Sequence, residues 1–121
     1  MKGKKYDKNG VFTEGIAPVR KNGKWGFIDE NYNEICELKY DRVAYFNEGF
    51  AGVMFSDKWG FIDKKGKEIC PLIYQSVAPF RHGYARVELD GKCGLIDTTG
   101  EVVLKIKYKE IYTVEGRYVL P

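Results

Sequence analysis

The chain contains 121 residues, which is enough for one domain or a short row of repeats and too few for two ordinary domains. Hydrophobic residues make up 44% and aromatic residues 15%, which supports a packed core and argues against disorder, and no apolar run is long enough for a membrane span. The formal net charge is +3, and because the lysines among residues 1–11 account for that excess, a broad nucleic-acid surface is excluded.

One short motif recurs along the chain at a fixed interval of 34 residues. The string Trp-Gly-Phe-Ile-Asp occupies residues 25–29 and 59–63, and residues 93–97 repeat it with Cys93 and Leu95 in place of Trp and Phe. A fixed period of this kind indicates a repeat protein. We predict a single repeat domain over residues 1–121, divided into a partial unit (1–11), three repeats (12–45, 46–79 and 80–113) and a second partial unit (114–121).

The second repeat shows the expected elements most clearly. Residues 50–55 and 58–63 are short and rich in aliphatic and aromatic residues, which is typical of strands, and Ser56–Asp57 between them suits a two-residue hairpin turn. A second turn follows at residues 63–66. Residues 67–70 then form the expected third strand before the chain crosses to the next repeat.

Two details of these elements can be predicted from strand and turn geometry. Trp59 and Phe61 should face the core, and Lys58 should lie on the opposite face, because successive side chains of a strand alternate. In the first repeat the second turn, residues 29–32, lacks a glycine, so we expect Asn31 to adopt the left-handed conformation there.

The glycines at fixed places in every repeat argue against helical hairpins, which this period would also fit, since an interior glycine costs a helix about 1 kcal/mol. We therefore predict an all-β fold of tandem three-stranded meander or hairpin repeats. Partial units at both ends favour an open, solenoid-like array. The alternative is a closed pseudo-threefold barrel or propeller-like body, in which the N-terminal tail pairs near residues 114–120.

The repeated strings also carry a family resemblance. The chain resembles the WG-repeat proteins in Lys-Trp-Gly-Phe-Ile-Asp at residues 24–29 and 58–63, Glu-Gly at residues 14–15 and 48–49, and Pro-Leu-Ile-Tyr at residues 71–74. This similarity covers residues 12–113, and the third repeat departs from it at Cys93 and Leu95. The resemblance implies a bacterial-type β-repeat with no assigned catalytic residue and no settled ligand.

The residues that could support catalysis have simpler interpretations. Asp29, Asp63 and Asp97 recur at one position, but each precedes a turn whose backbone N–H groups an aspartate caps, so we interpret them as turn residues. His82 is the single histidine, and it stands beside a turn glycine where the other repeats carry glutamate. We predict no catalytic residue, no metal site, no cofactor and no enzymatic activity.

The three cysteines, Cys36, Cys70 and Cys93, form no close pair of the kind that a structural zinc site requires. Cys36 and Cys70 are repeat equivalents, and Leu104 stands at the third copy, which indicates an apolar packing position. Cys93 takes the place of a tryptophan, so it leaves either relaxed packing near the end of the array or a pocket. Unpaired thiols and the lack of a signal peptide favour the cytoplasm.

Three lysines in equivalent places are the first candidates for binding. If the repeats stack in register, Lys24, Lys58 and Lys92 form a row that either protects strand edges or meets an anionic ligand. Tyr84 and Tyr112 are less tied to the repeat pattern than most of the other tyrosines, and tyrosine is enriched at protein interfaces. These five residues are the predicted ligand- or partner-binding set.

Repeat arrays present extended surfaces, so we expect a non-enzymatic scaffold that binds another protein through a face of the array. The alternative is a module that binds a small anionic ligand, nucleotide-like or glycan, through the lysine row and nearby tyrosines. Exposed edges also favour self-association through residues 105–120, although the lysines of that segment oppose it. We expect a cytoplasmic protein with no broad nucleic-acid surface and no membrane span.

Overall fold

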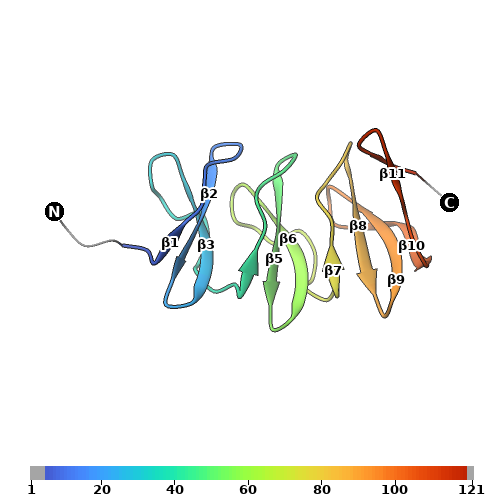
Figure 1. The fold of residues 1–121 in the computed structure, drawn as a ribbon, viewed down its shortest axis with the longest axis horizontal. Coiled ribbons are helices and arrows are strands. Elements are labelled where there is room, and N and C mark those ends of the chain that lie inside the picture. The colour runs from blue at the N-terminus through green and yellow to red at the C-terminus, as the bar shows by residue number, and fades with distance from the viewer. Residues whose placement is uncertain (1–4, 120–121) are drawn as a thin grey trace.

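The computed structural model describes residues 5–119, which form strands and turns but no helix, and hence no helix able to cross a membrane. Three hairpin-based units follow one another along the long axis, and residues 8–9 and 113–118 lie at opposite ends of the array (Figure 1). The described residues form several small antiparallel sheets rather than one closed sheet. The all-β open array is therefore confirmed, and the closed alternative is wrong because the two ends do not meet.

Each of the three larger sheets is built on a hairpin of two six-residue strands. The strand orders are β1-β2-β3, β4-β5-β6, β10-β9-β8-β7 and β11-β12. The strands are β1 (Lys8–Asn9), β2 (Ile16–Lys21), β3 (Lys24–Asp29), β4 (Arg42–Val43), β5 (Phe50–Phe55), β6 (Lys58–Asp63), β7 (Ser76–Val77), β8 (Tyr84–Leu89), β9 (Lys92–Asp97), β10 (Val102–Tyr108), β11 (Thr113–Val114) and β12 (Arg117–Tyr118).

The three hairpins β2–β3, β5–β6 and β8–β9 have the predicted form. Strands β5 and β6 have the expected bounds, and Phe55 lies opposite Lys58 across a two-residue turn. Both turn residues of every hairpin have positive φ, as in Asn22 (54°) and Gly23 (80°). Such φ values characterise the type I′ turn, whose twist matches the right-handed twist of the flanking strands.

The predicted third strand at residues 67–70 is wrong, and its first-repeat equivalent is likewise not a strand. The chain makes isolated bridges there, such as that between Ile62 and Glu68, and the third strand of the sheet is β4, which precedes the hairpin. The turn of the following repeat packs against this segment, since a Cβ on Gly100 would lie 2.0 Å from the Ile69 carbonyl oxygen. The last complete repeat has no such neighbour among the described residues, and its equivalent segment straightens into β10.

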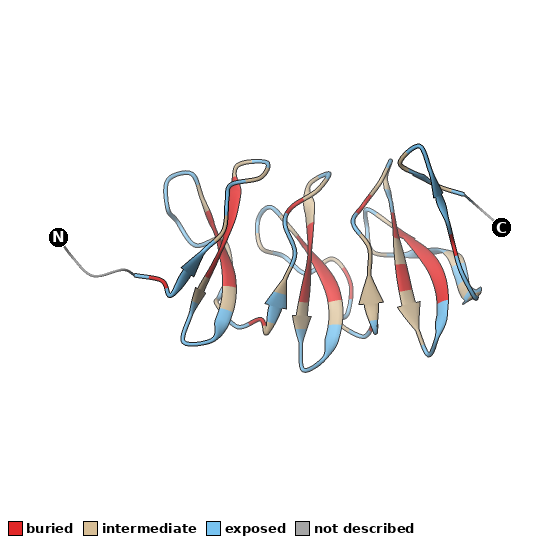
Figure 2. Cartoon of the chain, viewed as in Figure 1, coloured by how far each residue is buried: buried red, intermediate tan, exposed pale blue. Residues whose placement is uncertain are grey.

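The hydrophobic core lies between the repeats rather than inside them. The buried residues that form it lie mainly on the hairpin strands of all three units (Figure 2). On β6, Phe61 packs with Phe80 and Ala85 of the following repeat, whereas Ile62 packs with Phe27 of the preceding one. All five side chains are at most 1% exposed. Because burying one such aromatic or aliphatic side chain contributes about 2–3 kcal/mol, each boundary stabilises the two repeats that it joins.

The expectation of one core face per strand is therefore wrong. On β6, Ile62 fills the face opposite Trp59 and is fully buried, while Trp59 itself is only partly buried. Lys58 is exposed because it begins its strand beside the hairpin turn, beyond the buried part of that face. The first repeat shows the same pattern.

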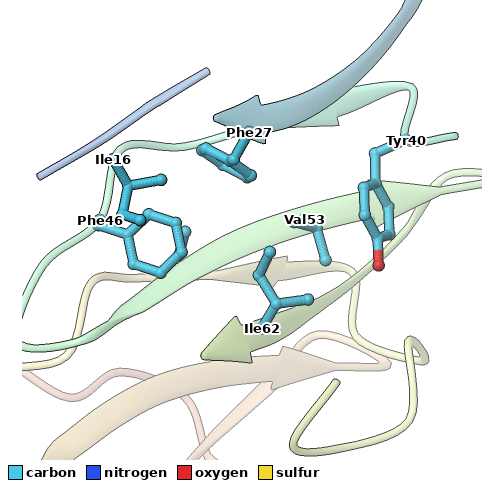
Figure 3. Close-up of a cluster of buried hydrophobic side chains, with 7 residues drawn as sticks. Ile16, Phe27, Tyr40, Phe46, Val53 and Ile62 are labelled. Carbon is cyan, nitrogen blue, oxygen red and sulfur yellow. The ribbon is translucent and has the colours of Figure 1, made fainter. Parts of the chain in front are cut away.

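Aromatic rings join successive repeats at equivalent places. The rings of Phe27 and Phe46 lie edge to face with centroids 5.0 Å apart, and those of Phe61 and Phe80 repeat this contact at 4.8 Å. Figure 3 shows the first of these boundaries, where Ile16 lies beside Phe46. Pairs of this geometry add about 0.5–1.5 kcal/mol to the stabilisation that comes from buried area alone.

The left-handed residue in the second turn of the first repeat is Tyr32 (φ 63°), so the expectation for Asn31 is wrong. In the next repeat Gly66 holds this place, and a Cβ there would lie 2.0 Å from the Ile35 carbonyl oxygen. Tyr32 is 70% exposed and its ring packs edge-on against Phe12 at 6.3 Å, so within residues 5–119 its side chain is not set against the backbone of a neighbouring repeat. The contact between repeats, in addition to the turn itself, therefore decides where glycine is required.

We predict that Gly66→Ala destabilises the protein more than Gly83→Ala. Both glycines have positive φ (82° and 88°), so alanine costs either site about 1 kcal/mol of left-handed strain. Only at residue 66 does the added methyl group also meet the neighbouring backbone, which should cost roughly 2 kcal/mol more. Urea unfolding of both variants, followed by circular dichroism, measures the difference, and equal losses would contradict the close packing of successive repeats.

Candidate functional site

The three predicted lysines lie along one edge of the array, each at the first residue of the returning strand of a hairpin (Figure 1, lower edge). Lys24 Nζ lies 2.5 Å from Asp41 Oδ1, and its hydrogen bond lowers the pKa of the Asp41 carboxyl. Gln75 and Lys109 take the place of Asp41 in the next two repeats. The two later lysines therefore lack this partner.

Acidic residues interrupt the lysine row. Asp57 lies in the hairpin turn directly before Lys58, and Asp90 lies in the turn before Lys92. With Lys24 already paired, the row is an alternation of charges rather than a continuous basic stripe.

The first predicted tyrosine, Tyr84, lies at the C-terminal end of the array and is 45% exposed. It contributes to an apolar pocket of about 260 Å³, which we call the C-terminal pocket and which is lined by Tyr84, Leu95, Val103, Leu104 and Tyr118. This volume is enough for one bulky apolar side chain.

The second predicted tyrosine, Tyr112, lies at the same end and is 66% exposed. It lines an adjoining hollow of about 350 Å³ together with Ala78, Arg81, Arg86, Ile111, Thr113 and Tyr118. Because Tyr118 belongs to both hollows, the structure brings the two predicted tyrosines to one surface. The three lysines do not gather there as a group, since they belong to three successive repeats.

Within the described residues the last complete repeat is followed by a two-stranded hairpin, β11–β12, rather than by a full three-stranded sheet, and the C-terminal pocket lies beside it. Where a complete repeat follows, its first phenylalanine covers the preceding repeat. In the last hairpin Val114 pairs with Arg117 as Arg81 pairs with Tyr84, so Thr113, which is exposed, stands at the place of Phe80.

The short hairpin β11–β12 is held by the Tyr118 hydroxyl, which donates to the Pro79 carbonyl at 2.8 Å. Through Tyr118 this hairpin helps to bury Leu95, but Val103 at the same pocket remains 51% exposed.

Cys93 does not open the pocket that its missing indole ring could have left. Its side chain is 3% exposed, and Arg86 Nη1 donates to its sulfur at 3.4 Å. The Cys93 thiol in turn faces the Lys109 carbonyl at 3.9 Å. The guanidinium group and the following segment thus occupy the space of the ring, and the hollow lies further along β9, at Leu95.

A family model for the WG containing repeat matches residues 4–25, 25–59, 59–93 and 94–118. The chain belongs to the WG-repeat family. The resemblance seen in the Trp-Gly strings is thereby confirmed, and the matches extend it into both partial units. No curated protein and no solved structure matched the chain.

Glutamate carboxylates join successive WG repeats, a role that the sequence interpretation missed. Glu14 accepts the backbone N–H groups of Glu48 and Gly49 at 2.7 and 2.8 Å, and Glu48 accepts those of His82 and Gly83 at 2.8 and 3.1 Å. The recurrence of Glu-Gly at the repeat interval was the available signal. His82 ends this series because it stands where the glutamate would be.

The turn aspartates of the WG repeats act on their own backbones, as predicted. Asp63 Oδ1 accepts the N–H groups of Lys65 and Lys67 at 2.9 and 3.0 Å, and Asp29 and Asp97 make the equivalent contacts. Within residues 5–119 no group of three or more His, Cys, Asp or Glu side chains is arranged to hold a metal ion.

The cysteines are unpaired, and two of them pack as apolar side chains. Burial raises the pKa of the Cys36 and Cys70 thiols, which contact the core clusters at the first and second boundaries between repeats. All three cysteines are free. A raised thiol pKa disfavours the reactive thiolate, so these two side chains contribute to packing rather than to chemistry.

We predict that Glu48→Ala destabilises the protein by about 1–2 kcal/mol more than Glu115→Ala, because only Glu48 has a carboxylate bonded to a following turn. Both residues have a φ of 51°, so the backbone strain of the two alanine variants is matched. Thermal unfolding of both variants measures the difference. An equal effect at the two positions would show that the carboxylate contact does not stabilise the boundary.

Proposed function

We propose that this WG-repeat protein is a non-enzymatic scaffold that binds another protein through the C-terminal end of its array. The observation that carries the proposal is the C-terminal pocket, an apolar hollow of about 260 Å³ with an exposed tyrosine at its rim. Inside the array the equivalent surface is covered by the following repeat. At the C-terminal end, the part of the chain that the structure describes covers it with the short hairpin β11–β12 alone, and a partner protein completes the packing.

The surroundings of the C-terminal pocket support a protein partner. Four aliphatic side chains near it are between 43% and 59% exposed, namely Val102, Val103, Val114 and Val119. Arg81 and Arg86 line the adjoining hollow with two tyrosines. Tyrosine and arginine around an apolar centre are the composition enriched in protein interfaces.

A small anionic ligand on the lysine row is the second candidate. Lys58 and Lys92 favour it because neither forms an ion pair within the described residues 5–119. The Lys24–Asp41 pair and the acidic hairpin turns oppose it. Self-association through residues 105–120 is a third outcome, which the positive charges of that segment oppose.

The proposal includes a bacterial, cytoplasmic setting. Three free cysteines suit a reducing compartment, because thiols of an oxidising compartment are usually paired.

Site-specific photo-cross-linking in the producing cells tests the proposed binding end. The photoreactive residue p-benzoylphenylalanine replaces Tyr84 in one variant and Tyr32, which is 70% exposed at the opposite end, in the matched control. We expect a cross-linked partner from position 84, at about tenfold higher yield than from position 32. We also expect Val103→Glu to abolish it, because a charge at the rim of an apolar pocket is costly to desolvate.

Each other result would contradict the proposal. Equal yields from the two ends would place binding elsewhere on the array. Adducts of twice the mass of the chain would show that the bound molecule is a second copy of this chain rather than a different protein. Yields at position 84 that Val103→Glu leaves unchanged would exclude the C-terminal pocket.

A further inference from the structure

A lysine followed by a tyrosine recurs in three equivalent places with the same geometry. The ammonium nitrogen lies 5.5 Å from the ring centroid in the pairs Lys5–Tyr6 and Lys39–Tyr40, and 5.3 Å from it in Lys107–Tyr108. The tyrosines of the second and third pairs bridge to equivalent strand positions, Trp25 and Cys93. The three pairs therefore present an ammonium group and a phenol in one repeated arrangement.

The first two pairs each bind a carboxylate that belongs to the following repeat. The Tyr6 hydroxyl donates to Glu34 Oε2 at 2.8 Å, and Lys5 Nζ lies 3.7 Å from the same oxygen. In the second pair the corresponding distances to Glu68 Oε2 are 2.8 and 3.6 Å. The arrangement is thus a carboxylate site that is used twice within the chain.

The remaining copy of the site shows that the lysine accompanies the carboxylate. Where the third repeat carries Val102 in place of the glutamate, the preceding repeat carries Ile73 in place of the lysine, before Tyr74. For Lys107 the equivalent glutamate position is not among residues 1–121. No ion pair or hydrogen bond joins the side chain of Lys107 or Tyr108 to any residue between 5 and 119.

We propose that Lys107 and Tyr108 bind a carboxylate side chain of the partner protein, supplied by an extended acidic segment that also places an apolar side chain in the C-terminal pocket. This inference rests on the proposed function and deepens it. Tyr108 packs on the same cluster as Leu104 and Tyr118, two residues of that pocket. The carboxylate site and the apolar pocket therefore belong to one surface.

The spacing along β10 defines the partner segment. Leu104 lies opposite Leu95 and Tyr108 lies opposite Cys93, so β10 bulges between them and they are separated along the sheet by two residues of β9, about 7 Å at the rise of an extended chain. A segment lying along β10 would therefore carry its apolar and acidic residues about two positions apart. Strand β10 lies at the edge of its sheet, so its outer side is open to such a segment.

The charge of this end favours an acidic occupant. Lys105, Lys107, Lys109 and Arg117 are all exposed, against Glu101, Glu115 and Glu110, of which Glu110 already accepts the hydroxyl of Tyr112, so this end has a small positive excess. A carboxylate entering here would gain a charge-assisted hydrogen bond from the tyrosine hydroxyl and an ammonium neighbour. The same charges oppose docking of a second identical end.

A peptide titration tests the assignment. The probe is a capped nine-residue peptide with phenylalanine at position 4, glutamate at position 6 and threonine or serine elsewhere, and its binding is followed by the amide chemical shifts of the full chain. We expect saturable binding with shifts centred on residues 104–108. Lys107→Met should raise Kd about tenfold and Tyr108→Phe about threefold, whereas the matched control Lys105→Met should change it less than twofold.

The carboxylate is identified by a second peptide in which glutamine replaces the glutamate. On the unaltered protein the Kd of the glutamine peptide should be about tenfold higher than that of the glutamate peptide. On the Lys107→Met variant the two peptides should have equal Kd values, which is the pattern of a direct pair. Equal Kd values for the two peptides on the unaltered protein, or no saturable binding up to about 5 mM, would overturn the assignment. If sodium glutarate bound as tightly as the peptide, the site would be one for a free carboxylate. That result would overturn the proposal that an extended segment of a partner protein supplies the carboxylate.

The failure of this inference is distinguishable from the failure of the proposed function. If a partner cross-links at position 84 and Lys107→Met leaves its yield unchanged, the proposed function stands and the carboxylate assignment is overturned. If no partner cross-links at position 84, the proposed function fails, whatever the peptides show.

Discussion

A strand that carries apolar side chains on both faces can bury them only if it has a neighbour on either side. The middle hairpin meets that condition with a repeat on either side, since Phe61 is buried against the following repeat and Ile62 against the preceding one. No repeat therefore holds a complete core of its own. Stability in such an array comes from the boundaries, and each boundary depends on two copies of the motif.

The same constraint sets what happens at the two ends. At the N-terminal end, Tyr6 and β1 cover the first hairpin, and Ala17, Val19 and Ile28 are almost fully buried. At the C-terminal end, β11–β12 is too short to do as much, and the pocket at Tyr84 stays open. This asymmetry between the ends is the physical reason to place a partner at one end rather than along the side of the array.

Much of this arrangement could be predicted from the sequence, because it depends on local chemistry. The bounds of β5 and β6, the positive φ of the hairpin turns and the capping of turns by Asp63 all follow from residue types at short spacing. The placement of Tyr84 and Tyr112 at one surface was not predictable in the same way. It depends on how the last partial unit folds back, which a repeat alignment does not describe.

Contacts between repeats were the part that sequence reasoning missed. Three features depend on groups about one half to one repeat away along the chain. They are the absence of a strand at residues 67–70, the left-handed conformation of Tyr32 and the pairing of Lys24 with Asp41. A pattern read within one repeat cannot show them. The covarying lysine and glutamate positions hold such information, but their meaning requires the distance between them, which only the stacked structure supplies.

Native-state amide hydrogen exchange of a Phe80→Leu variant tests most directly whether the core lies between the repeats. Phe80 begins the third repeat, yet its ring lies 4.8 Å from that of Phe61 in the second. The account predicts that protection decreases in β6 and in β8 together, by a similar factor. A decrease confined to the third repeat, with β6 unchanged, would show that each repeat holds its own core and would contradict the account.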